Sequence, residues 1–356
     1  MTTELRTRRA RIAGQFVVAA LAMAVLAFVT LSINARSLRD EPAGGLVAPE
    51  LSERIDAVRT VRITTAQGVM TMARTDGGWV MRERGDFPVR ADRLGQLADG
   101  LREMAFQRRM TSDPDKFDRI GLDDPTQGGR GVLLQMEDAD GALVVDLIVG
   151  VETDAGGLYA RRATQNQAWA VSGDLPQLRD VASWLAIAPI PVDSLKVNRV
   201  DITPASGRAY SLLPLVLGES TGFSFAPPLR GIAARSNLEL QELAGRLGKL
   251  EPIDVSPAVA VQGAPKARIS LSTTDDIVID AQIIAVPDGG DWLKVSARNA
   301  VDTPEAQAAA AAINQGAGQW AYKLSQTEAD SLAPVFETLL PQALQPMPAT
   351  LPLAPR

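Results

Sequence analysis

Residues 58–81, VRTVRITTAQGVMTMARTDGGWVM, decide the fold class of this chain. Apolar and polar side chains alternate along 58–65, 68–74 and 77–83. A period of two is typical of strands that bury one face, and a Gln-Gly turn and an Asp-Gly-Gly turn separate the three runs. The stretch therefore predicts three antiparallel strands with a common buried face.

The residues that follow these strands have helical spacing. Leu94, Leu97, Leu101 and Met104 recur at intervals of three and four, which predicts an amphipathic helix over 91–106. Further strands are expected at 132–137, 142–150, 158–162 and 168–171. We expect Asp174 to cap a helix that carries Leu178, Val181 and Leu185 on one face and ends near Pro189 and Pro191.

The same order of elements then starts again. The strands expected in the second half are 197–203, 207–213, 222–226, 267–273, 276–286, 292–298 and 320–324. A helix at 236–250 falls between the third and fourth of them, and a last helix covers 326–340. An Ala-rich helix after Thr303 is an insertion, with Thr303 as its cap and Pro304 at its first position.

Short local matches support an internal duplication. Ile63-Thr64 corresponds to Ile202-Thr203, and Trp169-Ala170 corresponds to Trp320-Ala321. Val144-Val145-Asp146 likewise corresponds to Val278-Ile279-Asp280. The fold class predicted is α+β, with two related domains of antiparallel sheet and helices. Their boundaries are expected at 51–191 and 192–340.

An apolar segment precedes these domains. Residues 12–33 contain no charge and span roughly 30 Å as a helix, which predicts a transmembrane anchor. Residues 1–11 carry four arginines and one glutamate, so the positive-inside rule places them in the cytoplasm. Residues 34–50 form a linker, and 341–356 a Pro-rich tail expected to be extended or disordered.

A cleaved signal peptide is the competing interpretation of the apolar segment. Signal peptides have shorter apolar regions and an A-x-A-like exit, whereas this run is 22 residues long and Ile33 precedes Ala35 by two positions. An uncleaved anchor fits better. The protein is therefore expected in a bacterial inner membrane, with a single pass and its folded domains in the periplasm.

Composition excludes several kinds of site. The chain has no cysteine and no histidine, so disulfides, thiol nucleophiles, imidazole bases and His or Cys metal sites are absent. The net charge is −6, and because the first eleven residues contribute +3, the remainder carries −9. An acidic exported domain is atypical of nucleic-acid binding. The sequence indicates no cofactor and no catalytic constellation.

Several turn-like motifs resemble a known family. They are Asp76-Gly77-Gly78-Trp79, the helical LADGL at 97–101, Ile120-Gly121-Leu122-Asp123-Asp124-Pro125, Val149-Gly150 and Tyr159-Ala160-Arg161. Over about 50–340 the chain resembles bacterial envelope proteins grouped as "domain of unknown function 4340". The Ile120–Pro125 segment is similar to the Gly-Leu-x-x-Pro element of that family. The second half lacks this element, so only the first half matches in detail.

This resemblance implies an association and no mechanism. Genes for such proteins are often found beside components of gliding-motility-type ABC transporters, and the family has no agreed activity. The resemblance therefore implies an accessory subunit of an ABC-type transport complex.

Acidic and basic clusters are the remaining candidate sites. Asp113, Asp115, Asp118, Asp123 and Asp124 offer oxygens to calcium, but the spacing lacks the glycine and the final glutamate of an EF-hand. Asp113-Pro114 and Asp124-Pro125 are ordinary turn signals, so a capped loop is expected and no metal site is assigned.

Two arginine pairs stand out in an acidic chain. Arg108 with Arg109, and Arg161 with Arg162, are tentative contacts for a partner or an anion, with a solvated strand or helix end as the alternative.

Three functions remain open. The leading one is a non-enzymatic, membrane-anchored scaffold or accessory subunit of a membrane complex. The second is a domain that binds an envelope lipid or glycan in a cleft between the repeats. The third is a hydrolase that uses carboxylates alone.

Overall fold

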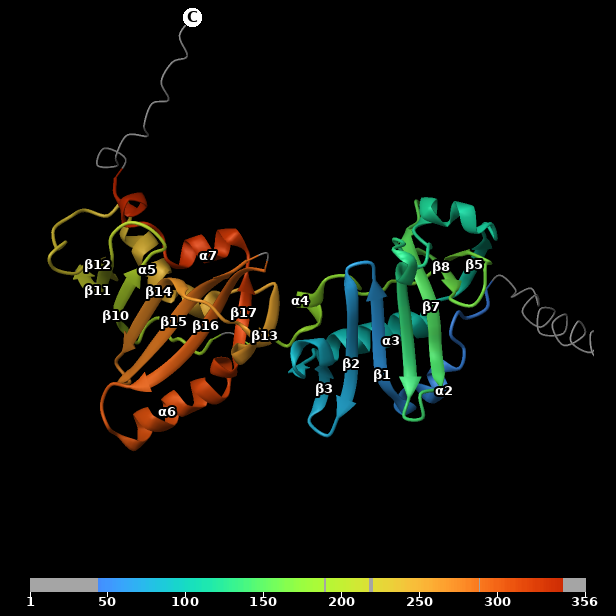
Figure 1. The fold of residues 1–356 in the computed structure, drawn as a ribbon, viewed down its shortest axis with the longest axis horizontal. Coiled ribbons are helices and arrows are strands. Elements are labelled where there is room, and N and C mark those ends of the chain that lie inside the picture. The colour runs from blue at the N-terminus through green and yellow to red at the C-terminus, as the bar shows by residue number, and fades with distance from the viewer. Residues whose placement is uncertain (1–43, 189, 218–219, 288, 342–356) are drawn as a thin grey trace, which may run out of the picture. The chain divides into compact units, whose positions relative to one another are not determined.

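The computed structural model describes residues 44–188, 190–217, 220–287 and 289–341. Within them the chain forms two antiparallel sheets with helices packed on them (Figure 1). The α+β class predicted from the alternating and helical patterns is therefore confirmed.

The first sheet contains nine of the described strands. They are β1 (Val58–Thr65), β2 (Gly68–Thr75), β3 (Gly78–Met81), β4 (Phe87–Pro88), β5 (Phe106–Arg109), β6 (Val132–Asp138), β7 (Leu143–Glu152), β8 (Leu158–Arg162) and β9 (Trp169–Val171). Their order across the sheet is β4-β3-β2-β1-β6-β7-β8-β9-β5.

The second sheet contains eight of the described strands. They are β10 (Val197–Thr203), β11 (Tyr210–Leu217), β12 (Ser220–Phe225), β13 (Asp254–Pro257), β14 (Pro265–Thr273), β15 (Ile277–Val286), β16 (Gly290–Asn299) and β17 (Trp320–Leu324). Their order is β12-β11-β10-β14-β15-β16-β17-β13.

Helices connect and cover these strands. The α-helices are α2 (Leu51–Arg54), α3 (Ala91–Glu103), α4 (Val181–Trp184), α5 (Asn237–Gly245), α6 (Pro304–Gln315) and α7 (Gln326–Leu332). Segments of 3₁₀ helix include η2 (Arg82–Arg84), η3 (Pro114–Ile120), η4 (Pro125–Gln127), η5 (Arg246–Lys249), η6 (Ala258–Ala260), η7 (Ala317–Gln319) and η8 (Phe336–Leu339). Leu97 and Leu101 of α3 are fully buried, as their helical spacing requires.

The two sheets share their order of strands and details of their pairing. Strand β1 pairs with β6 and β10 with β14, and each register shifts after the first residue, at Val58 and at Val197. Gln135 donates to Asp146 across β6 and β7 at 3.0 Å, and Ser270 donates to Asp280 across β14 and β15 at 2.6 Å. The aspartates matched from sequence thus occupy corresponding places.

Local turn and cap chemistry also follows the sequence. Asp140-Gly141 joins β6 to β7, with Gly141 at φ +79°. Thr303 caps α6 by accepting from the amide of Ala306, and Pro304 occupies the first turn. These residues supply the backbone geometry and the acceptors that such ends require.

Some predicted helices are shorter than their patterns suggested. The helix expected from Asp174 is wrong: α4 covers only Val181–Trp184, and Asp180 caps it. The last helix stops at Leu332, ahead of Pro334, and resumes as η8. Proline cannot continue the hydrogen-bond ladder, which explains the second break. Edge strands β5 and β13 were not predicted, because four-residue strands carry little periodic signal.

The described chain divides into two compact units. Residues 44–68 and 96–176 form the first, with β1 and β5–β9. Residues 69–95 and 177–341 form the second, with β2–β4 and the second sheet. The predicted boundary at residue 191 separates the two repeats expected from the sequence, and it stays a prediction.

The predicted anchor at 12–33 lies outside the described residues. Among the residues that are described, no helix has the length and apolar character needed to cross a membrane.

Candidate functional site

A buried arginine holds the long connection between β5 and β6 in the first unit. The Arg161 side chain lies in the core, with 6% of the residue exposed. Its Nε donates to the carbonyl of Leu122 at 3.1 Å, and one terminal nitrogen donates to the carbonyls of Ala163 and Gln165 at 3.1 and 3.2 Å. The guanidinium also lies 4.8 Å from the centre of the Phe117 ring. Arg161 therefore organises main chain in the core of this unit.

The electrostatics of Arg161 reflect this burial. Desolvation lowers the pKa of its guanidinium from the ordinary value, and the charges of Asp124, Asp123 and Asp146 oppose that shift. An arginine remains charged under all physiological conditions. The site is thus a buried positive charge that is solvated by carbonyl oxygens.

Glycines and capping carboxylates shape the connection that Arg161 holds. Asp113 and Asp124 accept from backbone amides at the starts of η3 and η4. Gly121 ends η3 at φ +64°, and a Cβ on Gly150 would lie 2.2 Å from the carbonyl oxygen of Ile120. Asp123 accepts from the amide of Arg130 at 2.7 Å. Asp113 and Asp124 of the acidic cluster are therefore caps, as the turn signals Asp113-Pro114 and Asp124-Pro125 predicted.

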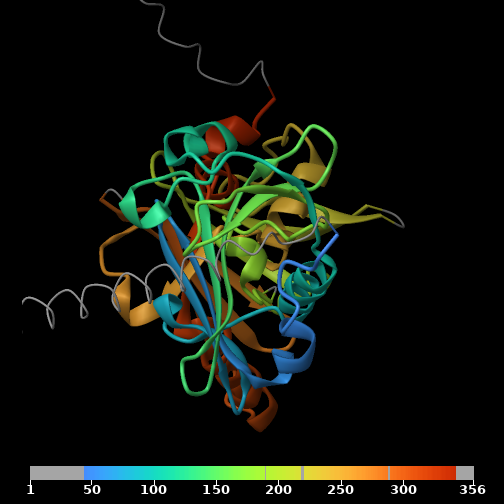
Figure 2. The same cartoon turned by 90° about the vertical axis from the view of Figure 1, so that its right-hand side faces the viewer.

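The outer surface of this connection is charged. Residues 110–131 lie at one end of β7 and β8 in both views of the ribbon (Figures 1 and 2). The side chains that remain exposed include Asp115, Lys116, Asp118 and Arg119. Below, "the Arg161 loop" means residues 110–131. The Arg161 loop therefore carries exposed charges of both signs, and buried hydrogen bonds hold its backbone in place.

The other arginines singled out from sequence are not brought together with Arg161. Arg108 is exposed on β5. Arg109 donates to the Gln167 side chain at 3.0 Å and lies 5.7 Å from the Trp169 ring. Arg162 lies 6.0 Å from the Phe106 ring. Their role as partner or anion contacts stays a prediction.

Arg162 also lines a pocket in the first unit. The pocket has a volume of about 280 Å³ and is lined by residues 47–50 and 143–147, which include Glu50 and Asp146, together with Arg162 and Thr164. Carboxylates and hydrogen-bond donors both face this space, so it suits a small polar molecule. Sequence reasoning missed it because Glu50 and Arg162 lie more than one hundred residues apart.

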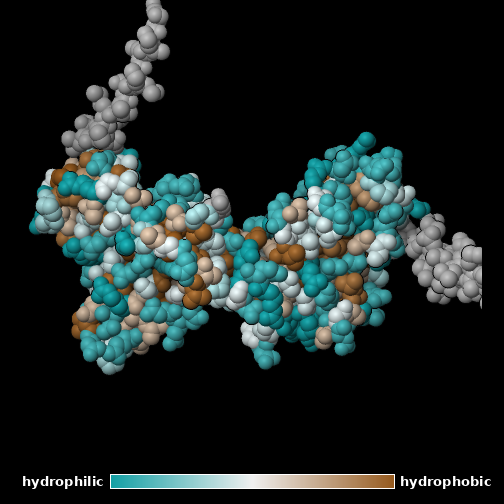
Figure 3. Space-filling model, in the orientation of Figure 1, coloured by the Kyte–Doolittle hydropathy of each residue, from teal (hydrophilic) through white to brown (hydrophobic). Residues whose placement is uncertain are grey.

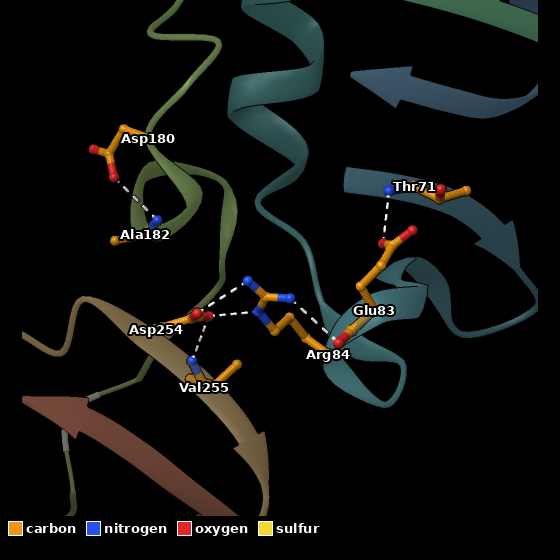
Figure 4. A network of polar contacts seen from close by, with 7 residues as sticks. All are labelled: Thr71, Glu83, Arg84, Asp180, Ala182, Asp254 and Val255. Carbon is orange, nitrogen blue, oxygen red and sulfur yellow. Dashed lines mark hydrogen bonds and ion pairs between the residues drawn. The ribbon is translucent and has the colours of Figure 1, made fainter. Parts of the chain in front are cut away.

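An ion pair fixes the turn after β3 in the second unit. The Nε and one terminal nitrogen of Arg84 donate to the two carboxylate oxygens of Asp254, at 2.6 and 2.9 Å, and Asp254 also accepts from the amide of Val255 (Figure 4). Glu83 beside it accepts from the amide of Thr71 at 2.7 Å. A bidentate, half-buried pair of this kind restricts geometry more than a single surface contact does.

An apolar groove lies in the same unit. Phe87 meets Trp320 edge to face, with ring centres 4.7 Å apart. Trp320 and Tyr322 contribute to a groove of about 330 Å³ with Phe87, Pro88 and the end of α6. Burial raises the pKa of the Tyr322 hydroxyl to about 12. Trp169 is buried, whereas Trp320, to which the sequence matches it, is partly exposed and lines this groove.

The strength of the Arg84–Asp254 pair can be measured. In a double-mutant cycle with Arg84→Ala and Asp254→Ala we expect a coupling of about 1 kcal/mol, because the pair is bidentate and about one-quarter exposed. The exposed pair Arg82–Asp86 is the control, with an expected coupling of about 0.3 kcal/mol. Equal couplings, measured by urea unfolding, would contradict the assignment.

Comparison with known proteins finds one family model that matches part of the chain. Residues 79–221 match the family model described as "Domain of unknown function (DUF4340)". The match contains LADGL at 97–101, the Ile120–Pro125 element and Arg161, so the resemblance is confirmed over this segment. No curated protein and no solved structure matches the chain.

Proposed function

We propose that this chain, with a DUF4340 match over 79–221, is a membrane-anchored, exported scaffold or accessory subunit of a membrane complex, in particular an ABC-type transporter. The observation that carries the proposal is the Arg161 loop. It is a 22-residue connection that is capped, hydrogen-bonded and supported by a buried arginine.

A rigid charged loop suits the recognition of a protein partner. Loops that a scaffold holds in place commonly carry binding functions. A preorganised loop also loses less conformational entropy on binding than a mobile one, so more of its contact energy is available for affinity. Lys116, which forms an ion pair with Asp113 at 3.0 Å, and Arg119 carry exposed positive charges that are suited to an acidic surface.

The duplication fits a scaffold in which the two copies have diverged. The shared strand order and the matching register shifts support an origin by internal repeat. The copies differ in the length of the connection between their edge strand and the next central strand. Residues 110–131 fill this connection in the first copy, whereas 258–264 suffice in the second. We infer that the first copy carries the recognition loop.

The predicted anchor adds proximity to this arrangement. An uncharged segment of 22 residues would confine the chain to the membrane and place its domains in the periplasm. Confinement raises the effective concentration of the domains near a membrane partner. Modest affinity at the Arg161 loop would then be sufficient for assembly.

A pull-down of the full-length protein in mild detergent, followed by mass spectrometry, tests the proposal. We expect membrane-complex subunits with the unaltered chain and about tenfold lower recovery with Lys116→Glu and Arg119→Glu together, because each reversal turns attraction into repulsion. The control is Lys249→Glu with Arg268→Glu, exposed residues far from the loop in sequence, with the same charge change. Equal recovery from both variants would refute the role of the loop, and no partner with any chain would refute the scaffold.

The polar pocket at Arg162 favours a second candidate, the binding of an envelope glycan or lipid headgroup. Asp146, Arg162 and Thr164 provide acceptors and donors of the kind that hydroxyl-rich ligands use. Native mass spectrometry of the purified chain would detect such a ligand. If the bound ligand is lost in the variant Arg162→Ala, the result supports ligand binding as the function in place of the scaffold.

A further inference from the structure

We propose that the Pro-rich end of this chain, residues 342–356, docks back into the apolar groove beside Trp320 of the second unit. The inference is independent of the proposed function. The described residues line an apolar groove, and a segment of the same chain has the composition that such a groove binds.

The groove offers an aromatic and aliphatic lining. Its aromatic members are Phe87, Trp320 and Tyr322, and the residues that complete it are Pro88, Ala186, Ala188, Pro191, Ala312, Ile313, Gln315, Gly316 and Ala317. Most of the face drawn in Figure 3 is hydrophilic, and apolar patches on it are small. Aromatic-lined grooves are the usual receptors of proline-rich segments in the polyproline II conformation. The Gln315 amide provides a donor of the kind that binds peptide carbonyls.

The end of the chain has the matching composition. Residues 342–356 read QALQPMPATLPLAPR, with four prolines and with Arg356 as the one charged side chain. Pro352-Leu353-Ala354-Pro355 is a PxxP sequence, which favours the polyproline II helix. Segments that remain disordered in water usually contain many charged residues. This segment instead carries leucines and a methionine, whose burial is favourable.

The groove is within reach of this segment. The described chain ends at Pro341 in the second unit, which is the unit that contains the groove. Fifteen further residues extend about 45 Å at 3.1 Å per residue. A compact unit of roughly 190 residues has a radius of gyration of about 16 Å, so the segment is long enough to extend over much of the surface of its own unit. The covalent link supplies a local concentration in the millimolar range, enough for a weak docking site to be occupied.

Distance measurement between two spin labels tests the proposal on the full chain in detergent. Because the chain has no cysteine, Ala308→Cys on the exposed side of α6 and Leu353→Cys in the tail can be labelled uniquely. Docking predicts a narrow distribution of short distances. The variant Ala312→Glu places a charge in the groove, and Pro352→Ala with Pro355→Ala removes the PxxP sequence. We expect either change to reduce the short-distance population about tenfold.

The control is Ala311→Glu, an exposed α6 residue that does not line the groove, which should leave the distribution narrow. Circular dichroism establishes that each variant is folded. A broad distribution in the unaltered chain, as expected if detergent or lipid fills the groove, would overturn the proposal. So would a narrow distribution that survives Ala312→Glu, or one that disappears when unlabelled chain is added in excess, since the tail would then dock elsewhere or on a second copy.

Discussion

Replacing Arg161 by alanine is expected to lower the free energy of unfolding of the first unit by about 3–5 kcal/mol. The change leaves the carbonyls of Leu122, Ala163 and Gln165 without their buried donor. It also removes the contact between the guanidinium and Phe117. Urea unfolding followed by circular dichroism measures the loss. Hydrogen exchange of residues 120–131 should show that the Arg161 loop opens first.

Two further variants make this prediction specific to Arg161. Arg161→Lys should lose most of the same free energy, because one ammonium group cannot reproduce the fork of donors that a guanidinium offers. Arg162→Ala, at the next residue, should cost about 1 kcal/mol or less, because its side chain is only partly buried and contacts the Phe106 ring at 6.0 Å. Similar losses from Arg161→Ala and Arg162→Ala would show that burial of Arg161 does not support the loop.

Two glycines of helix α3 are expected to respond to alanine with opposite signs. Gly100→Ala should destabilise the protein by about 2 kcal/mol or more, because a Cβ at this position would lie 2.1 Å from the carbonyl oxygen of Asp174. Gly95→Ala should instead stabilise it by about 0.5–1 kcal/mol. No atom lies within 4 Å of the new Cβ, and alanine is the better helix former.

The pair forms its own matched control. Both glycines lie within Ala91–Glu103, so differences in helix propensity cancel between them. The urea midpoint of each variant, compared with that of the unaltered chain, shows whether the substitution stabilises or destabilises the protein. Stabilisation by both substitutions would mean that helix α3 does not approach the 174–175 backbone as closely as the structure shows.

Local sequence patterns were sufficient to predict most strands and turns of this protein. The alternation along 58–75 produces strands, because successive side chains of a strand point to opposite faces. Asp140-Gly141 and Thr303-Pro304 produce a hairpin and a helix start, because the required backbone angles and acceptors belong to those residues alone. The order of elements in two halves was visible for the same reason.

The use of individual residues depends on packing between distant parts of the chain. Arg161 and Arg162 are neighbours of the same type, yet one is in the core and the other partly exposed, because β8 turns them to opposite faces. Gly95 and Gly100 likewise differ only in what packs against them. The groove at Trp320 and the pocket at Arg162 join residues that are distant along the chain. Local patterns carry no information about such long-range neighbours, so these sites were determined by packing.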